Sequence, residues 1–222
     1  MSPGHPGVRT RLAQVAADIA REYDVGGVHL DFVRYPSTDY SYDELSLAVF
    51  DSLRALEPGL EFDEMRRRFV TWAVAEVRDS LETVRTDAEL SAAVWGIYSN
   101  KLGWSGVGTG YASVLQDARA WDRQGLIDAL APMVYWTITP TYGDRLDFAY
   151  LADEHTFSIE APVFIGVYAP GMDGHALAQH VERARMAGAE GISVFSYSGL
   201  DDPDLWGELR TWAFFWPARR VN

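Results

Sequence analysis

Ionisable side chains interrupt an apolar stretch at residues 25–36, which reads VGGVHLDFVRYP and contains His29, Asp31 and Arg34. Because side chains alternate along a strand, His29 and Asp31 point to one face and Leu30 points to the other. A carboxylate kept ionised between an imidazole and a guanidinium can act as a nucleophile or stabilise positive charge. Glycoside hydrolysis uses such a group, because its transition state resembles an oxocarbenium ion.

A structural role for Asp31 is the alternative. An unpaired charge costs several kcal/mol to bury, so a charged residue inside an apolar strand needs a partner. An ion pair with Arg34, or a hydrogen bond with His29, would supply one. The two roles differ in where the carboxylate lies: a structural pair is sealed in the interior, whereas a catalytic carboxylate opens into a pocket.

Hydrophobic periodicity places these residues between a helix and a long polar segment. Residues 8–23 carry apolar side chains at three- and four-residue spacing, which predicts an amphipathic helix. The apolar positions are Val8, Leu12, Val15, Ile19 and Tyr23. The run at 27–33 is short and rich in β-branched and aromatic residues, which predicts a buried strand. The polar segment 36–62 predicts a long loop or lid with a short helix, and helical periodicity resumes at 63–84.

The rest of the chain repeats one pattern, in which an apolar strand is followed by an amphipathic helix. The predicted strands are 91–98, 128–136, 161–169 and 191–198, and the helices after them are 111–125, 144–155, 174–188 and 203–215. Continuous apolar strands joined by helices are typical of parallel sheets with both faces covered. The sequence therefore predicts an α/β fold.

Four of the predicted strands finish with a tyrosine: Tyr98, Tyr135, Tyr168 and Tyr197. The intervals between these tyrosines are each roughly 30 residues, which fits one strand-helix unit of a (β/α)8 barrel. Active sites of such barrels are built at the carboxyl ends of the strands. We therefore expect the four phenol rings, together with Trp136, to line a shared cleft, although a tyrosine in a strand is also common as simple packing.

Bulk composition limits the classes of partner. The net charge of −13, with only 19 basic residues, disfavours nucleic acid. No apolar run reaches the roughly 18 residues of a membrane span, and the amino terminus has no signal-like core. The chain has no cysteine and no His spacing typical of zinc, and it lacks phosphate-binding glycine motifs, so we expect no metal and no cofactor. Eight tryptophans among 222 residues suit a carbohydrate ligand.

Residues 5–36 resemble the glycosyl-hydrolase-like family ten, bacterial proteins related to the α-amylase clan, whose hallmark is a strand followed by arginine-tyrosine-proline. The segments LQDARAWDRQGLIDALAPMVYW and GAEGISVFSYSGL resemble later parts of the same family. The resemblance implies a TIM barrel that acts on carbohydrate, and relatives are typically exported. The compartment of this chain is left open. Gly26 departs from the family, which carries aspartate at that position.

The resemblance also implies roles for individual residues. Asp31 would be the nucleophile, and His29, Arg34 and Tyr35 would shape its subsite. In the α-amylase clan an arginine lies two residues before the nucleophile, and here that position is His29.

By the same resemblance, the strand at Asp31 corresponds to strand four of the barrel. The chain would then be a single partial barrel domain over 1–222, with about five strand-helix units, strands four to eight. Open sheet edges present unpaired N–H and C=O groups, which favours self-association. We expect an N-terminally truncated barrel that either associates through these edges or remains an open sheet.

A glycosidase needs a second carboxylic acid, and none follows the strand that ends near Tyr98. The remaining candidates are Asp144, Asp173, Asp201 and Asp202, each of which can equally be a loop or helix-cap charge. The alternative function is therefore a barrel, or a barrel fragment, that binds carbohydrate without cleaving it. An aldolase- or isomerase-like barrel is a weaker alternative, because Lys101 is the only lysine.

Overall fold

The computed structural model describes residues 2–138, 146–200 and 203–215. It confirms an α/β fold whose paired strands are parallel. The chain divides into two compact units, Met1–Leu130 and Ala131–Asn222. Each unit is a separate body in the description below. The single partial barrel over 1–222, with strands four to eight of a complete barrel, stays a prediction.

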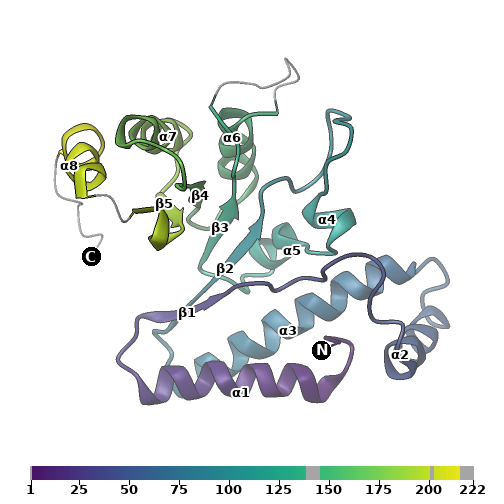
Figure 1. Ribbon diagram of the computed structural model, residues 1–222. Coiled ribbons are helices and arrows are strands. Elements are labelled where there is room, and N and C mark those ends of the chain that lie inside the picture. Colours follow the sequence, from purple (N-terminus) through teal and green to yellow (C-terminus); the bar gives the residue numbers. More distant parts are fainter. Residues whose placement is uncertain (1, 139–145, 201–202, 216–222) are drawn as a thin grey trace. The chain divides into compact units, whose positions relative to one another are not determined.

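The first unit contains two paired strands, the start of a third, and the helices between them (Figure 1). Its elements are α1 (Pro6–Glu22), β1 (Gly27–Leu30), α2 (Glu44–Arg54), α3 (Phe62–Val84), β2 (Glu89–Trp95), α4 (Gly110–Ser113), α5 (Ala118–Arg123) and the beginning of β3 (Ala129–Met133). β1 pairs with β2 from Gly27 opposite Glu89 to Leu30 opposite Ala92. The sheet order is β1, β2, β3, so β1 is the edge strand.

The strand predicted at 27–33 ends early, at Leu30. Phe32 has φ 53°, in the left-handed region that non-glycine residues rarely adopt. Two local hydrogen bonds hold this turn: the Phe32 N–H donates to Asp31 Oδ1 at 2.7 Å, and the Arg34 N–H donates to Phe32 O at 2.7 Å. Asp31 is therefore the first residue after the strand and part of a turn.

The helix predicted at 111–125 is interrupted, because Leu115 has φ 53° and separates α4 from α5. The next residue, Gln116, is buried, and its side chain forms hydrogen bonds with the backbone of two segments, the residues after β1 and the strand β2. Its Nε2 donates to Val33 O at 3.2 Å and Ala93 O at 3.3 Å, and its Oε1 accepts from Trp95 N at 2.8 Å. One amide side chain thus ties the segment after β1 to β2.

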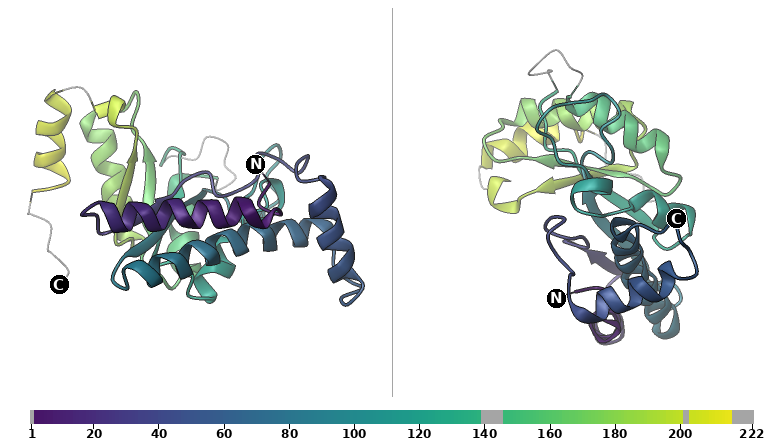
Figure 2. Two further views of the ribbon diagram at one scale, coloured as in Figure 1. Left: turned by 90° about the horizontal axis from the view of Figure 1, so that it is seen from below. Right: turned by 90° about the vertical axis from the view of Figure 1, so that its right-hand side faces the viewer.

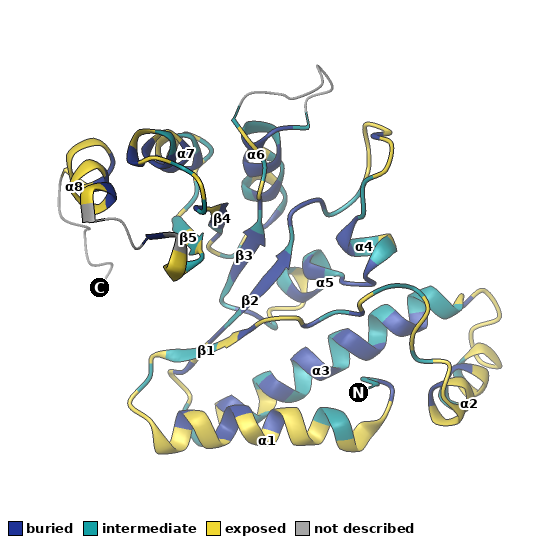
Figure 3. Cartoon of the chain, in the orientation of Figure 1, coloured by how far each residue is buried: buried dark blue, intermediate teal, exposed yellow. Residues whose placement is uncertain are grey.

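Helices α1 and α3 lie side by side in both Figure 1 and Figure 2. The residues that α1 buries are the alanines Ala13, Ala16, Ala17 and Ala20. The larger side chains of the predicted apolar face are exposed, by 37% at Leu12, 39% at Val15, 37% at Ile19 and 63% at Tyr23. Figure 3 shows the same division along α1, in which buried and exposed residues alternate by turn. The small residues permit a close helix contact, and the large ones face outward.

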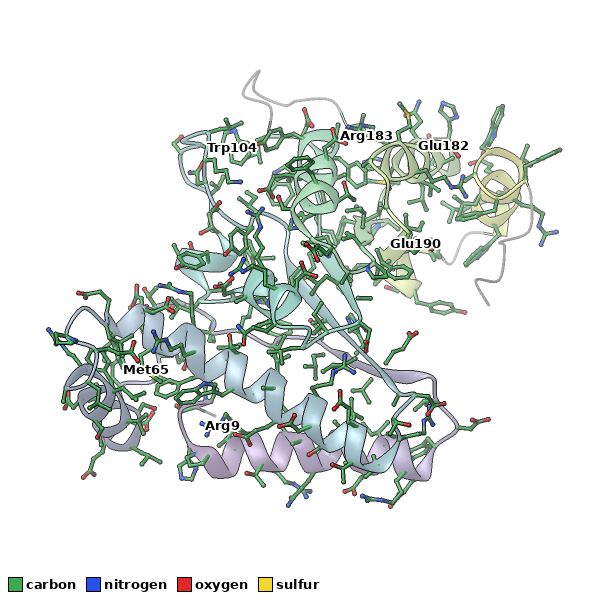
Figure 4. All side chains as sticks on the ribbon, turned by 180° about the vertical axis from the view of Figure 1, so that it is seen from behind. Arg9, Met65, Trp104, Glu182, Arg183 and Glu190 are labelled. Atoms are coloured by element: carbon green, nitrogen blue, oxygen red, sulfur yellow. The ribbon has the colours of Figure 1, made fainter. Side chains whose placement is uncertain are left out.

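The segment predicted as a loop or lid is attached to α3. A cluster of Phe50, Leu60, Met65 and Phe69 joins α2 to α3, with Met65 visible between them in Figure 4. Arg66 is buried, and its Nη1 donates to Thr38 O at 2.5 Å and Tyr40 O at 2.9 Å. Its guanidinium also lies over the Tyr42 and Phe62 rings and pairs with Asp63.

The second unit contains the end of β3, followed by two strand-helix repeats. Its further elements are α6 (Phe148–Ser158), β4 (Phe164–Tyr168), α7 (Gly174–Met186), β5 (Gly191–Phe195), the 3-10 turn η1 (Tyr197–Leu200) and α8 (Pro203–Trp212). β4 and β5 pair in parallel from Phe164 opposite Gly191 to Tyr168 opposite Phe195. A Cβ on Gly166 would lie 2.7 Å from Pro132 O, so glycine permits β4 to approach the end of β3. Over the described ranges, no helix is long and apolar enough to cross a membrane.

We predict that Arg66→Met destabilises the first unit by about 2 to 4 kcal/mol, because the Thr38 and Tyr40 carbonyls lose their donor and Asp63 loses its buried ion-pair partner. Arg68→Met is the matched control on the same helix: Arg68 makes a partly exposed pair with Glu57, and such pairs contribute less than about 1 kcal/mol. Urea unfolding of both variants measures the difference. Equal midpoints for the two variants would contradict this role for Arg66.

A second prediction concerns pH. Burial raises the pKa of Tyr35 to about 12, so the folded chain holds this proton more tightly than the unfolded chain does. The resulting stabilisation is complete below the unfolded pKa near 10 and is lost as pH rises toward 12, and it amounts to about 2 to 3 kcal/mol. Tyr35→Phe should flatten this part of the stability curve. Urea unfolding between pH 9 and 12 tests it, and parallel curves for the two proteins would refute it.

Candidate functional site

Asp31 lies at the carboxyl end of β1 and is exposed. His29 is exposed on the same strand, opposite Ser91 in the parallel register, and its Nδ1 lies 2.8 Å from Ser91 Oγ. Leu30, between them, is buried. The backbone N–H of Phe32 donates to one carboxylate oxygen of Asp31, which fixes the orientation of the carboxylate. The sealed interior pair considered from the sequence does not describe this exposed carboxylate.

Arg34 stacks on aromatic rings next to Asp31. Its Cζ lies 4.2 Å from the centre of the Phe32 ring and 5.2 Å from the centre of the Trp95 ring. Trp95 is itself fixed, because its indole N–H donates to Gly108 O at 2.8 Å. Cation–π contact of this kind holds a guanidinium in place.

A groove of about 530 Å³ opens beside Asp31 within the first unit. Its walls come from α1, α3 and the end of β1, and they are mostly apolar. The lining includes Val8, Leu12, Val15, Leu30, Val33, Val70 and Ala73. Its charged members are Arg9, Arg11, Arg34 and Asp31, so Asp31 is the only carboxylate among the lining residues. Arg9, labelled in Figure 4, pairs with Glu76 of α3 at 2.6 Å.

Tyr35 and Tyr98 are supporting residues in the first unit. Tyr35 is 3% exposed, and its backbone N–H donates to Val114 O at 3.0 Å. Tyr98 lies three residues after β2, and its hydroxyl donates to Asp117 Oδ1 at 2.9 Å. Burial, followed by the charge of Asp117, raises the pKa of Tyr98 above its ordinary value. Arg119 covers the ring at 4.0 Å.

Three aromatic residues meet at the carboxyl ends of β3, β4 and β5 in the second unit, and we call them the aromatic trio: Tyr135, Tyr168 and Phe195. Ring centres are 5.8 Å apart for Tyr135 and Tyr168, 5.7 Å for Tyr135 and Phe195, and 6.1 Å for Tyr168 and Phe195. Exposed fractions of 37%, 43% and 53% leave each side chain open to solvent. The trio is a partly exposed aromatic surface.

The equal placement of four tyrosines at strand ends does not hold. Tyr168 is the last residue of β4 and pairs with Phe195, whereas Tyr197 lies two residues farther on, in η1, and is 80% exposed. The sequence pattern did not predict Phe195 as a strand end, because Tyr197 had been matched to the tyrosines that end the other predicted strands. Phe195 and Tyr197 lie on the same face of an extended chain, so alternation does not show which of them ends the strand.

Trp136 follows β3 and is half-buried. Its carbonyl oxygen lies 3.3 Å from Nε2 of His180, a buried residue of α7 whose Nδ1 lies 2.7 Å from Ala176 O. These contacts anchor the backbone at the end of β3 to α7. The contact of Trp136 with a ligand stays a prediction.

The candidates for a second carboxylic acid divide into two groups. Asp173 is exposed and caps α7, because its Oδ1 accepts the Ala176 N–H at 2.7 Å. Asp144, Asp201 and Asp202 lie outside the described residues.

Gly26, where the sequence departs from the family, lies at the amino end of β1, and Asp31 follows the carboxyl end of the same strand. The Gly26 carbonyl accepts the Glu89 N–H at 3.0 Å. Within the described part of the chain, no three histidine or carboxylate side chains gather in a way that could hold a metal ion.

Comparison with known proteins places these features in a family. A model of the family described as "Glycosyl hydrolase-like 10" matches residues 1–179. Glycosyl hydrolase DigH of Escherichia coli is 27% identical over 145 residues, which are 61% of this chain and 31% of that protein. Glycosyl hydrolase YngK of Bacillus subtilis is 23% identical over 142 residues, which are 61% of this chain and 28% of that protein. The chain thus spans about a third of the length of these relatives.

One solved structure shares the fold over most of the chain. Alpha-L-fucosidase isoenzyme 2 from Paenibacillus thiaminolyticus superposes with a TM-score of 0.56 and 14% identity, covering 94% of this chain and 29% of the fucosidase. At that identity the likeness concerns the fold alone. The family match covers most of the sequence and includes the strand that carries Asp31, and it confirms the resemblance noted from the sequence: the chain belongs to the glycosyl hydrolase-like 10 family.

Proposed function

We propose that the chain is part of the (β/α) barrel of a glycoside hydrolase and carries residues of its active site. The enzyme acts on O-glycosidic bonds of a polysaccharide. The observation that carries the proposal is the position of Asp31, an exposed carboxylate at the carboxyl end of a parallel strand. Parallel (β/α) barrels build their active sites at that end. In this proposal β1 to β5 correspond to strands four to eight of an incomplete barrel.

Asp31 acts as the nucleophile or as the group that stabilises the oxocarbenium-like transition state. The Phe32 N–H holds one carboxylate oxygen, which leaves the other for the anomeric carbon. In this proposal Arg34, His29 and Tyr35 shape the subsite: Arg34 stacks on Phe32, His29 contacts Ser91, and Tyr35 is buried. A carboxylate that is held in place needs little reorganisation when positive charge develops on the sugar.

The aromatic trio supplies stacking surface for sugar rings in the second unit. Flat, partly exposed rings suit the apolar faces of pyranoses, and aromatic side chains combine a large contact area with few rotatable bonds. Tyr197 and Trp136 extend this surface within the second unit. We propose bacterial cell-wall or other amino-sugar glycans as the substrate class, because the matched relatives are bacterial glycosyl hydrolases.

A second candidate function is carbohydrate binding without cleavage. The observation that favours it is the groove beside Asp31, whose lining includes no other carboxylate. A retaining enzyme needs a second carboxyl about 5 Å from the first, and an inverting enzyme needs one about 6.5 to 9.5 Å away. In this alternative Asp31 contributes a hydrogen bond to the sugar and no chemistry.

Replacement of Asp31 separates the two functions. We expect Asp31→Asn to lower kcat on chitooligosaccharides or cell-wall glycan strands by at least about 100-fold, because a neutral amide cannot stabilise the positive sugar. Asp24→Asn is the matched control, an exposed aspartate before the amino end of the same strand. Reducing-end release measures both. Equal rates for the wild type and Asp31→Asn would remove Asp31 from the mechanism, and oligosaccharide binding with no release by the wild type would favour the binding function.

The aromatic trio has its own test. Phe195→Ala should weaken binding of a chitooligosaccharide about tenfold, which corresponds to about 1.4 kcal/mol of lost stacking and burial. Phe157→Ala is the control, because Phe157 lies on α6 and is 93% exposed. Calorimetric titration of both variants gives the two dissociation constants. A Phe195→Ala value equal to that of the control would exclude the trio as a sugar platform.

A further inference from the structure

The exposed face of α7 carries a second groove of about 510 Å³, which lies within the second unit and which we call the α7 groove. Four α7 side chains at three- and four-residue spacing line it, so they follow one face of the helix. These four exposed residues are His175, Gln179, Glu182 and Met186. Trp212 of α8 lines the groove as well, whereas the aromatic trio does not. The α7 groove is therefore a different surface from the strand ends.

Trp212 is held beside α7 and remains open to solvent. The carboxylate of Glu208 on α8 accepts the Gly174 N–H at 2.8 Å, which ties α8 to the start of α7. The rings of Trp212 and His175 lie 5.8 Å apart, at an angle of 81°. The Trp212 side chain is nevertheless 60% exposed. An indole that is fixed in position but uncovered is a preformed surface for a flat, apolar face of a ligand.

The charged side chains that line the α7 groove are already paired. Glu182 forms an ion pair with Arg185 at 2.5 Å, and Arg183 forms one with Asp153 of α6 at 2.5 Å. Glu182 and Arg183 are both labelled in Figure 4. A charged ligand would have to compete with these pairs for its partner. The lining therefore favours a neutral ligand over an acidic or basic one.

Gln179 supplies neutral hydrogen-bonding groups next to the indole. Its Nε2 lies 3.1 Å from His175 Nε2, and the imidazole nitrogen accepts this bond because an amide NH2 group only donates. The amide has a second N–H to donate and an oxygen to accept, and a hydroxyl can bind either of them. A pyranose ring presents an apolar C–H face and a rim of hydroxyls. The pairing of Trp212 with Gln179 matches both features.

We propose that the α7 groove is a second carbohydrate-binding site, in which a sugar ring stacks on Trp212 and its hydroxyls bind Gln179. The exposed residues from His175 to Met186 extend over roughly 16 Å of helix, which is longer than one sugar ring, so the site takes an oligosaccharide segment. The proposal rests on the carbohydrate ligand of the proposed function and does not require cleavage at Asp31. A long glycan held here raises the local concentration of its other sugars at the strand ends.

Calorimetric titration with chitohexaose, a neutral oligosaccharide, tests the site in the full chain. The titrations use a Phe195→Ala background, so that the aromatic trio contributes little to binding. We expect Trp212→Ala to weaken binding at least about tenfold, because the stacking surface is lost. Trp206→Ala is the matched control, because Trp206 is a 50% exposed tryptophan of the same helix that lies outside the α7 groove.

Two further variants keep the test valid if Trp212→Ala does not fold. Trp212→Phe retains a flat ring and should bind within about threefold of the background chain. Gln179→Ala removes an exposed amide and should weaken binding about threefold, through the loss of a hydrogen bond. Equal binding by Gln179→Ala and the background chain, or loss of binding in Trp212→Phe as large as in Trp212→Ala, would contradict the proposed contacts.

Comparison with the chain that retains Phe195 separates this proposal from the aromatic trio. Binding that Phe195→Ala abolishes, or that Trp212→Ala leaves unchanged in the Phe195→Ala background, would overturn the α7 groove as a sugar site. Binding that Trp212→Ala abolishes and Phe195→Ala leaves unchanged would support the α7 groove and exclude the trio. If the wild-type chain binds no chitohexaose, both proposals fail.

Discussion

The parallel pairing of β1 with β2 determines where the chemistry of the first unit can lie. Four consecutive residue pairs, from Gly27 opposite Glu89 to Leu30 opposite Ala92, fix the direction of β1. Because the pairing stops at Leu30, Asp31 emerges at the carboxyl end of the strand and is not enclosed by neighbours. A shift of the register by one residue would exchange the faces of His29 and Leu30, burying an imidazole and exposing a leucine. The position of Asp31 therefore depends on backbone hydrogen bonds more than on its own ion pairs.

A buried amide reinforces this pairing beyond the strand. Gln116 binds the backbone of Val33, in the segment after β1, and of Ala93 and Trp95 on β2. A buried polar side chain with all of its groups satisfied specifies one geometry, because any other position leaves a donor or acceptor unpaired. The guanidinium of Arg34 also stacks over the ring of Trp95, which links the segment after β1 to β2 a second time. The segment after β1 is thus held by the hydrogen bond from Gln116 to Val33 and by the contact of Arg34 with the Trp95 ring.

Periodicity in the sequence was sufficient to predict the alternation of strands and helices, because apolar spacing of two or about four residues follows from which face is buried. The residues at which helices and strands end depend instead on local hydrogen bonds and backbone angles. Asp31 closes β1 through a hydrogen bond to the next N–H, and Leu115 divides a predicted helix by adopting a positive φ. Neither event changes the hydrophobic pattern. The tyrosine at 197 was misaligned for the same reason: a shift of two residues keeps a side chain on the same face of an extended chain, so composition does not distinguish Phe195 from Tyr197 as the end of the strand.

Helix α1 illustrates a limit of a different kind. The spacing of its large apolar residues predicted one apolar helix face, but the structure leaves Leu12, Val15, Ile19 and Tyr23 exposed, because spacing does not identify what packs against that face. In the first unit the alanines of α1 make the close contact with α3, and Val8, Leu12 and Val15 line a groove that Asp31 also lines. Any segment that fills this groove would exclude water from one side of the carboxylate. Electrostatic interactions strengthen as water is removed, so filling this groove would strengthen the interaction of Asp31 with a positively charged sugar.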